Sequence, residues 1–140
     1  MIKFYRTDHK VLSEITEYED NMWVCMTKPT VDETKLIAED FEIDLADVRA
    51  ALDDEESSRV EVEDGYTLIL VDIPSIEMRN EREAYTTIPL GIILVKDILI
   101  TVCAEDTPVL DAFIESKVKE FSTKKRMRFM YQILYRNCMT

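Results

Sequence analysis

The sequence of 140 residues contains a single histidine, His9, and this scarcity argues against several kinds of enzyme. A histidine-based catalytic triad or a zinc site has little to build on when the one imidazole lies near the N-terminus. The two glycines, Gly65 and Gly91, stand alone, so no glycine-rich phosphate-binding loop is present. No cysteine has a spaced histidine partner that could activate it. We therefore expect that the protein is not an enzyme.

The three cysteines lie far apart and form no Cys-x-x-Cys pair. Cys25 and Cys103 each lie in an apolar, strand-like run, which is typical of buried, reduced thiols in a cytosolic domain rather than of a disulfide framework. With only two glycines and four prolines, the sequence also leaves little room for linkers. The length suits one domain with a sizeable core, so we expect residues 1–140 to form a single domain.

Basic residues are fewer than acidic residues: the sequence has 17 lysines and arginines and 29 aspartates and glutamates. The resulting net charge of −12 argues against non-specific binding to nucleic acid or to an anionic membrane surface. It is compatible with cations as partners, although an excess of acidic residues more often serves only to keep a surface soluble. The charge balance therefore predicts no nucleic-acid partner.

The sequence has no long hydrophobic run, and its most apolar stretch is "IPLGIILVKDILITVCAED", from Ile88 to Asp106. A membrane span needs about 20 consecutive apolar residues, and Lys96-Asp97 interrupts this stretch at its centre. A signal segment would lie at the N-terminus, where "MIKFYRTDHK" lacks an apolar core. Two short β-branched runs around a polar pair instead predict a hairpin of buried strands, with Ile92, Leu94, Ile98 and Ile100 in the core. Lys96-Asp97 is not a preferred hairpin pair, so the type of turn stays open.

Helices and strands are predicted from periodicity and capping residues. Thr30 with Glu33 forms a capping box before one helix, and Asp44 caps a second. Thr107-Pro108 starts a third helix, and a fourth begins near Thr123. Strands are expected at "IKFYR", at "MWVCM" and in the region from Arg59 to Cys103, whereas 11–20 is irregular or a weak strand. The order predicts an α+β (mixed α/β) fold with helices packed on a largely antiparallel mixed sheet.

The two C-terminal helices have predicted core faces. For the third helix, the apolar spacing predicts a face of Val109, Leu110, Phe113, Ile114, Val118 and Phe121. For the fourth, it predicts a face of Met127, Met130, Tyr131, Leu134 and Cys138. The single tryptophan, Trp23, lies in a strand and is more readily a core residue than a binding platform.

The run "DDEESS" is the densest group of carboxylates in the sequence. Carboxylate oxygens suit Mg²⁺, so Asp53, Asp54, Glu55 and Glu56 are the candidate metal ligands. The alternative is a solvated loop between helix and strand, and the spacing does not match an EF-hand. The basic stretch "KKRMR", from Lys124 to Arg128, is most simply the solvated start of the last helix. We expect no tightly bound cofactor and, at most, weak binding of Mg²⁺.

The order of these motifs resembles the N-terminal cytoplasmic domain of the CorA family of magnesium transporters. The resemblance rests on Trp23 in a strand, a threonine-capped helix ending in Phe41-Glu42-Ile43, and Arg59-Val60-Glu61 leading into an apolar strand. The hairpin from Ile88 to Asp106 and the stretch "FMYQILYRNC" are similar to later elements of that family. The resemblance covers most of the chain from about Trp23 and depends on pattern rather than on an invariant motif.

The resemblance implies a mixed sheet between two sets of helices. In that family the domain continues into a long stalk helix and two membrane helices, assembled as a pentamer, with a Gly-Met-Asn motif at the pore. This sequence has no such tripeptide and no span. We therefore expect the cytosolic regulatory part of a divalent-cation transporter, lying on the cytoplasmic side of the cell membrane and attached to it only through segments beyond Thr140. Such a fragment cannot conduct ions by itself and is not expected to pentamerise tightly.

One position departs from the family pattern. Relatives carry an acidic residue in the second helix that helps to hold regulatory Mg²⁺ between subunits, and the best register places Ala50 there, next to Arg49. Asp47, Asp53 and Asp54 are nearby, but none matches that position. Metal sensing there is therefore in doubt, and the alternative function is a freestanding soluble interaction domain without a role in transport.

Overall fold

The computed structural model describes residues 1–53, 55–79 and 82–139. Its strands are β1 (Ile2–Asp8), β2 (Val11–Ile15), β3 (Trp23–Thr27), β4 (Arg59–Val62), β5 (Tyr66–Arg79), β6 (Arg82–Val95) and β7 (Ile98–Cys103). Its helices are α1 (Val31–Asp40), α2 (Leu45–Val48), α3 (Pro108–Ile114) and α4 (Arg126–Met139), with a short 3₁₀ helix, η1 (Ala50–Leu52).

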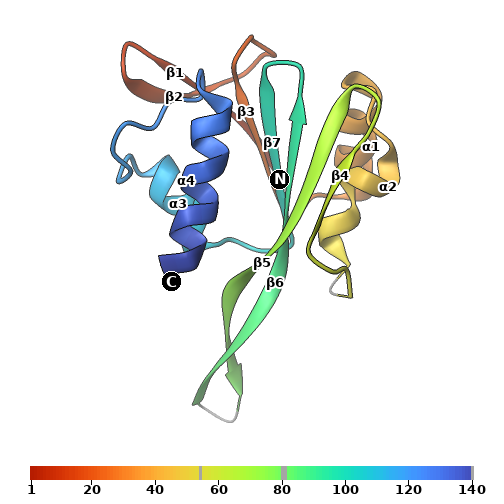
Figure 1. The fold of residues 1–140 in the computed structure, drawn as a ribbon, viewed down its shortest axis with the longest axis vertical. Helices are drawn as coiled ribbons and strands as arrows, with labels where there is room; N and C mark the ends of the chain where they lie inside the picture. The colour runs from red at the N-terminus through yellow and green to blue at the C-terminus, as the bar shows by residue number, and fades with distance from the viewer. Residues whose placement is uncertain (54, 80–81, 140) are drawn as a thin grey trace.

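The strands form one seven-stranded sheet in the order β2-β1-β3-β7-β6-β5-β4. Among the described strands, β3 and β7 pair in parallel, and every other neighbouring pair is antiparallel. The helices α1 and α2 lie on one side of the sheet, and α3 and α4 lie on the other (Figure 1). The predicted α+β fold with a largely antiparallel mixed sheet is therefore confirmed.

The predicted hairpin is formed by β6 and β7, which lie near the middle of the sheet. Its side chains are buried on both faces. Ile93, Ile100 and Val102 belong to the core under α1, α2 and η1. Ile92, Leu99 and Cys103 belong to the core under α3 and α4. Because helices cover both faces of the sheet, the sequences of these strands are continuously apolar and do not alternate between apolar and polar residues. This explains why the stretch from Ile88 to Asp106 is so apolar.

The predicted helix starts at Thr30, Asp44 and Thr107 are confirmed by their hydrogen bonds. The Glu33 backbone N–H donates to Thr30 Oγ1 at 3.1 Å, and the Thr30 backbone N–H donates to Glu33 Oε1 at 2.8 Å. The second of these bonds, together with the N-terminal amine 2.9 Å away, lowers the pKa of Glu33. At α3, Thr107 Oγ1 accepts the backbone N–H of Val109, and Pro108 occupies the first turn.

Two details of the sequence prediction are wrong or incomplete. Residues 11–15 form a regular edge strand, β2. The helix α3 ends at Ile114, so Val118 and Phe121 contact the core from the segment that follows it. In that segment Ser116 and Glu120 both have positive φ, which a helix cannot accommodate.

The buried face of α4 agrees with the prediction at Met130 and Leu134 but differs at other positions. The helix begins at Arg126, and its buried residues are Phe129, Met130 and Ile133. Met127 and Tyr131 are 48% and 62% exposed. The apolar periodicity was correct, but α4 has two apolar stripes, and only docking against the sheet selects one of them. The side chain of Cys138 lies outside the described part of the chain.

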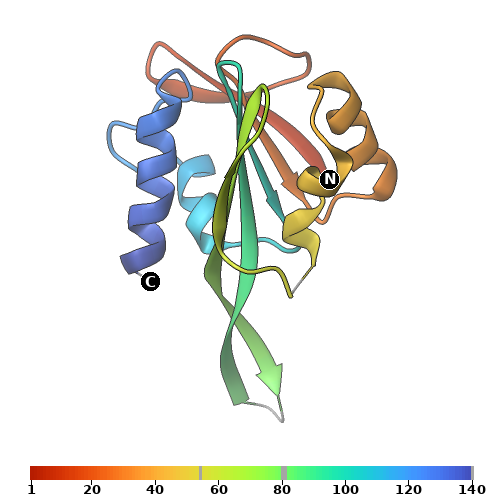
Figure 2. The same ribbon diagram turned by 45° about the vertical axis from the view of Figure 1, so that its right-hand side comes forward.

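Beyond the main body, β5 and β6 continue as a two-stranded ribbon (Figures 1 and 2). Each strand has 14 residues, and they pair from Tyr66–Val95 as far as Arg79–Arg82. β4 pairs with β5 only as far as Leu70, and β7 pairs with β6 only from Leu90 onward, so the rest of the ribbon has no further strand neighbour among the described residues. The polar turn predicted at 79–83 includes residues 80 and 81, which the described chain leaves out.

Candidate functional site

A group of three carboxylates lies where α2 meets the strand β4. Asp47 belongs to α2, Glu61 belongs to β4, and Glu63 follows β4 directly. One carboxylate oxygen from each of the three lies within 4.8 Å of the others. In the described part of the chain, this is the one group of three metal-ligating side chains that come so close together.

Local structure explains why two of these residues meet. Successive side chains of a strand point to opposite faces, so Glu61 and Glu63, two residues apart, share a face. The Asp64-Gly65 turn, with Gly65 at φ 91°, returns the chain into β5, and the Glu63 N–H donates to the Tyr66 carbonyl at 2.9 Å. The turn thus brings Tyr66 beside α2, where it contacts Asp47.

Two of the three carboxylates, those of Asp47 and Glu61, already have side-chain partners. The Tyr66 hydroxyl donates to Asp47 Oδ2 at 2.5 Å and accepts the backbone N–H of Asp44 at 3.3 Å. Arg59 Nε donates to Glu61 Oε1 at 2.5 Å. Because Arg59 neutralises Glu61, the negative electrostatic potential at the three carboxylates is weaker than three unpaired carboxylates would produce.

The chemistry of this group is that of a weak site for a hard cation. Carboxylate oxygens are suitable ligands for Mg²⁺, which keeps several waters and accepts one or two protein oxygens. Asp47 and Glu61 are only partly buried and Glu63 is exposed, so bulk water competes for the ion and screens the attraction. A cation would also compete with Arg59 for Glu61.

The predicted metal ligands occupy the loop between η1 and β4. Asp53 is exposed, and its Oδ1 accepts the Glu55 backbone N–H at 3.0 Å. Glu55 is exposed, and Glu56 Oε2 pairs with Arg59 at 2.5 Å. Asp54 lies outside the described residues. Within the described chain, Asp53, Glu55 and Glu56 do not form a three-carboxylate group of the kind formed by Asp47, Glu61 and Glu63.

Ala50, at the position where the family resemblance places an acidic residue, is only 6% exposed and lies in η1. It packs into the core together with Ala51, which touches β6 so closely that a Cβ on Gly91 would lie 3.2 Å from the Ala51 Cβ. The preceding Arg49 donates to Thr34 Oγ1 at 2.9 Å. A carboxylate at position 50 would therefore have to leave this packed surface to reach an ion.

The structure also places four other residues that the sequence analysis considered. Trp23 is fully buried, and its indole N–H donates to Thr101 Oγ1 at 2.9 Å, so its role is in the core. The His9 side chain is 94% exposed at the turn between β1 and β2. Cys25 and Cys103 are buried free thiols, and burial raises the pKa of Cys103 to about 11.

Alkaline pH offers a test of the contact between Tyr66 and Asp47. The pKa of Tyr66 is raised from 10.0 to about 12, mainly by burial and to a smaller extent by the hydrogen bond to Asp47. The contribution of this tyrosine to stability is therefore complete below pH 10 and is lost as the pH rises from about 10 to 12, where the unfolded chain ionises first. We expect the free energy of unfolding to fall over this range in denaturant titrations, and to fall less steeply in Tyr66→Phe. Equal slopes for the two proteins would contradict the assigned contact.

Several solved structures share the fold of this chain. The chain matches the structure of the soluble domain of CorA from Methanocaldococcus jannaschii with a TM-score of 0.76 and 22% identity, covering 96% of this chain and 54% of that one. It matches the complete CorA magnesium transporter from the same organism with a TM-score of 0.73 and 19% identity, covering 98% and 44%. The ZntB cytoplasmic domain from Vibrio parahaemolyticus matches with a TM-score of 0.70 and 14% identity, covering 95% and 55%. The chain thus spans about half the length of these proteins.

The sequence itself places the chain in a family. The model of the CorA-like Mg²⁺ transporter proteins matches residues 18–139, and the chain belongs to this family. The resemblance inferred from the sequence is confirmed, and the family is one of transporters rather than a class of enzymes. Comparison with curated protein sequences gives no match. Within the described residues, no helix is both long enough and apolar enough to cross a membrane.

Proposed function

We propose that this chain is the cytosolic regulatory domain of a CorA-like transporter of Mg²⁺ or another divalent cation. The observation that carries the proposal is the family match over residues 18–139, which the shared fold supports. The 140 residues form one domain, act without catalysis and conduct no ions themselves. Conduction belongs to membrane segments beyond this domain, which lies on the cytoplasmic side of the membrane.

Assembly is part of the proposal. The domain works as one subunit of a homo-oligomer, a pentamer in the full-length protein, and its other partners are divalent cations. The short 140-residue chain does not pentamerise tightly, because the stalk and membrane helices supply much of the contact in the family that it resembles. Sedimentation of the chain at micromolar concentration tests this point, and a stable pentamer would contradict it.

The reading frame beyond codon 140 provides the most direct test of the transport role. We expect a long charged helix, two apolar spans and a Gly-Met-Asn motif, and uptake of Mg²⁺ by cells that express the whole frame. A stop codon directly after Thr140 would overturn the transport role. It would leave the alternative, a freestanding soluble interaction domain.

Binding of Mg²⁺ by this domain is proposed to be weak. The candidate ligands are Asp53, Asp54, Glu55 and Glu56 in the loop, and the group of Asp47, Glu61 and Glu63 is a second position that the structure adds. Both are solvated, and Arg59 pairs with one glutamate of each set. Because Mg²⁺ gives up its inner waters reluctantly, such surfaces hold the hydrated ion through a screened field.

Thermal unfolding with Mg²⁺ varied at constant ionic strength tests this weak binding. We expect no change in the unfolding midpoint at micromolar Mg²⁺, since an ion stabilises the fold only when its concentration passes the dissociation constant. A clear rise at micromolar Mg²⁺ would contradict weak binding. Loss of that rise in Asp53→Asn would assign a specific site to the loop, and loss in Asp47→Asn would assign it to the second position.

A further inference from the structure

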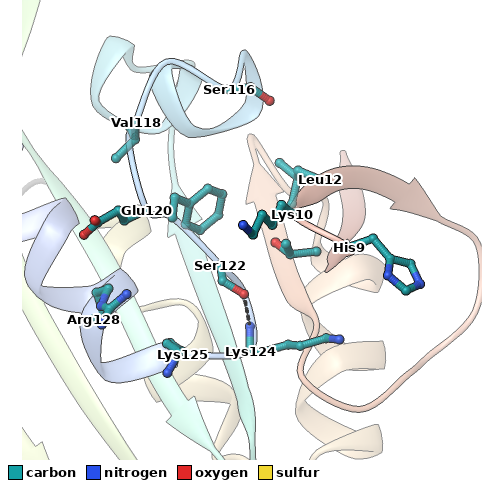
Figure 3. A pocket seen from close by; sticks show the side chains of 12 residues that line it. His9, Lys10, Leu12, Ser116, Val118, Glu120, Ser122, Lys124, Lys125 and Arg128 are labelled. Carbon is teal, nitrogen blue, oxygen red and sulfur yellow. Dashed lines mark hydrogen bonds between the residues drawn. The ribbon is translucent and has the colours of Figure 1, made fainter.

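A cleft of about 620 Å³ lies between the β1–β2 turn and the segment that joins α3 to α4 (Figure 3). One wall comes from residues 7–12, and the other comes from residues 116–128. The lining residues are of three kinds: basic (His9, Lys10, Lys124, Lys125, Arg128), apolar (Leu12, Val118, Phe121) and other polar (Thr7, Ser116, Glu120, Ser122).

The two walls of the cleft are held together by a reciprocal pair of hydrogen bonds. The Thr7 N–H donates to Thr123 Oγ1 at 2.8 Å, and the Thr123 N–H donates to Thr7 Oγ1 at 3.0 Å. Both threonines are buried, at 4% and 2% exposure. The cleft is thus formed by the folded chain itself and needs no ligand to bring its walls together.

The charge of the cleft is opposite to that of the whole chain. Four permanent cations and a single carboxylate line it, in a protein whose net charge is −12. Lys124 Nζ lies 3.6 Å from Asp8 Oδ1, which partly compensates it. Within the described residues, Lys10, Lys125 and Arg128 form no ion pair. Gathering four cations with so few counter-charges is unfavourable, and a bound anion would relieve that repulsion.

The side chains are arranged to meet a ligand from both walls. In Figure 3, Lys10 points from the β1–β2 turn toward the middle of the cleft, whereas the ring of His9 points away from it. Lys124 extends from the opposite wall toward the β1–β2 turn. Ser122 Oγ accepts the Lys124 N–H at 3.2 Å, which helps to fix the turn that carries this lysine.

We propose that this cleft binds a small anion that carries phosphate groups. Lysines recognise phosphate as point charges, and an arginine can add paired N–H donors. The volume lies within the range of small-molecule sites, about 300–1,000 Å³, and the apolar residues Leu12, Val118 and Phe121 can take a less polar part of the ligand. A long polyanion fits less well, because the acidic surface elsewhere on the chain repels it.

Two sources could supply this chemistry: a free phosphorylated compound or the headgroup of a phospholipid. Both present doubly or singly charged phosphate oxygens to the same cations. The proposal concerns the recognition of phosphate, and it goes beyond the proposed role in cation transport. An experiment with two probes distinguishes the sources.

The test uses inorganic pyrophosphate, without divalent cations and at low ionic strength, titrated into the 140-residue chain by calorimetry. The variant Lys10→Gln/Lys124→Gln removes one cation from each wall. The matched control is Lys35→Gln/Lys96→Gln, since both of its lysines are exposed outside the cleft and Lys96, like Lys10, has a positive φ. We expect pyrophosphate to bind and the cleft variant to weaken binding by about tenfold or more, with little change in the control. Circular dichroism checks that both variants fold.

A second arm of the test uses equimolar vesicles of phosphatidylglycerol and phosphatidylcholine in a sedimentation assay. Co-sedimentation that the cleft variant loses, and the control keeps, assigns the site to a lipid headgroup. Binding of pyrophosphate alone, lost in the same variant, assigns it to a free phosphorylated compound. The proposal is overturned if neither probe binds, or if both variants weaken binding equally, because the attraction would then be general and not that of the cleft.

Discussion

Replacing Phe129 by alanine is expected to lower the free energy of unfolding by about 3–5 kcal/mol. Phe129 is fully buried and joins α4 to the sheet. Its ring lies 4.9 Å from that of Trp23, 5.1 Å from that of Phe113 and 4.6 Å from that of Phe121, between ring centroids. The substitution would remove all three contacts and leave a cavity that the stiff neighbouring rings cannot fill.

The matched control for Phe129 lies on the same helix. Tyr131 is also aromatic but is 62% exposed, so Tyr131→Ala should change the free energy of unfolding by roughly 0.5 kcal/mol or less. Equilibrium denaturation in urea measures both variants. Comparable losses for the two would mean that α4 docks through a different face.

Replacing Ile100 by alanine is expected to cost about 2–5 kcal/mol, again as a loss in the free energy of unfolding. Ile100 is fully buried in β7, paired with Val24 of β3 on one side and Ile93 of β6 on the other. Its side chain packs in the core beneath α1 and α2. Because three strands converge at this position, the backbone cannot move inward to close the cavity.

An exposed strand residue provides the comparison for Ile100. Val62 in β4 is 80% exposed, so Val62→Ala should be almost neutral in the same urea titration. A loss at Val62 similar to that at Ile100 would show that β-propensity, and not burial, dominates the measurement. A near-neutral Ile100→Ala would refute the central position of the β6–β7 hairpin.

Most of the fold could be predicted from local sequence signals. The capping residues Thr30, Asp44 and Thr107 located three helix starts, because a side-chain oxygen that satisfies a free N–H acts within a few residues. The β-branched run from Ile88 to Cys103 predicted a buried hairpin for a similar reason: strand propensity and burial are properties of short segments. The parallel pairing of β3 with β7 had no such local signal, since it joins residues more than 70 positions apart.

The candidate site was less predictable than the fold. The sequence predicted the candidate ligands at the consecutive carboxylates from Asp53 to Glu56, because acidic residues are most densely spaced there. In the structure, the three carboxylates that lie close together are those of Asp47, Glu61 and Glu63. Asp47 comes from a helix, whereas Glu61 and Glu63 come from a strand and its end, which lie further along the sequence. The period-two spacing of Glu61 and Glu63 was a usable signal, but Asp47 could join them only through tertiary packing.

The sequence by itself determined the family and the chemical character of the core, because these depend on composition and on short-range pattern. Only the tertiary structure decided which stripe of α4 is buried, that Ala50 packs inward, and that basic residues from both ends of the chain gather in one cleft of an acidic protein. The physical reason is that charge and burial depend on distance in space. Thr7 and Thr123 share hydrogen bonds although they are 116 positions apart, so no short-range sequence pattern includes both residues.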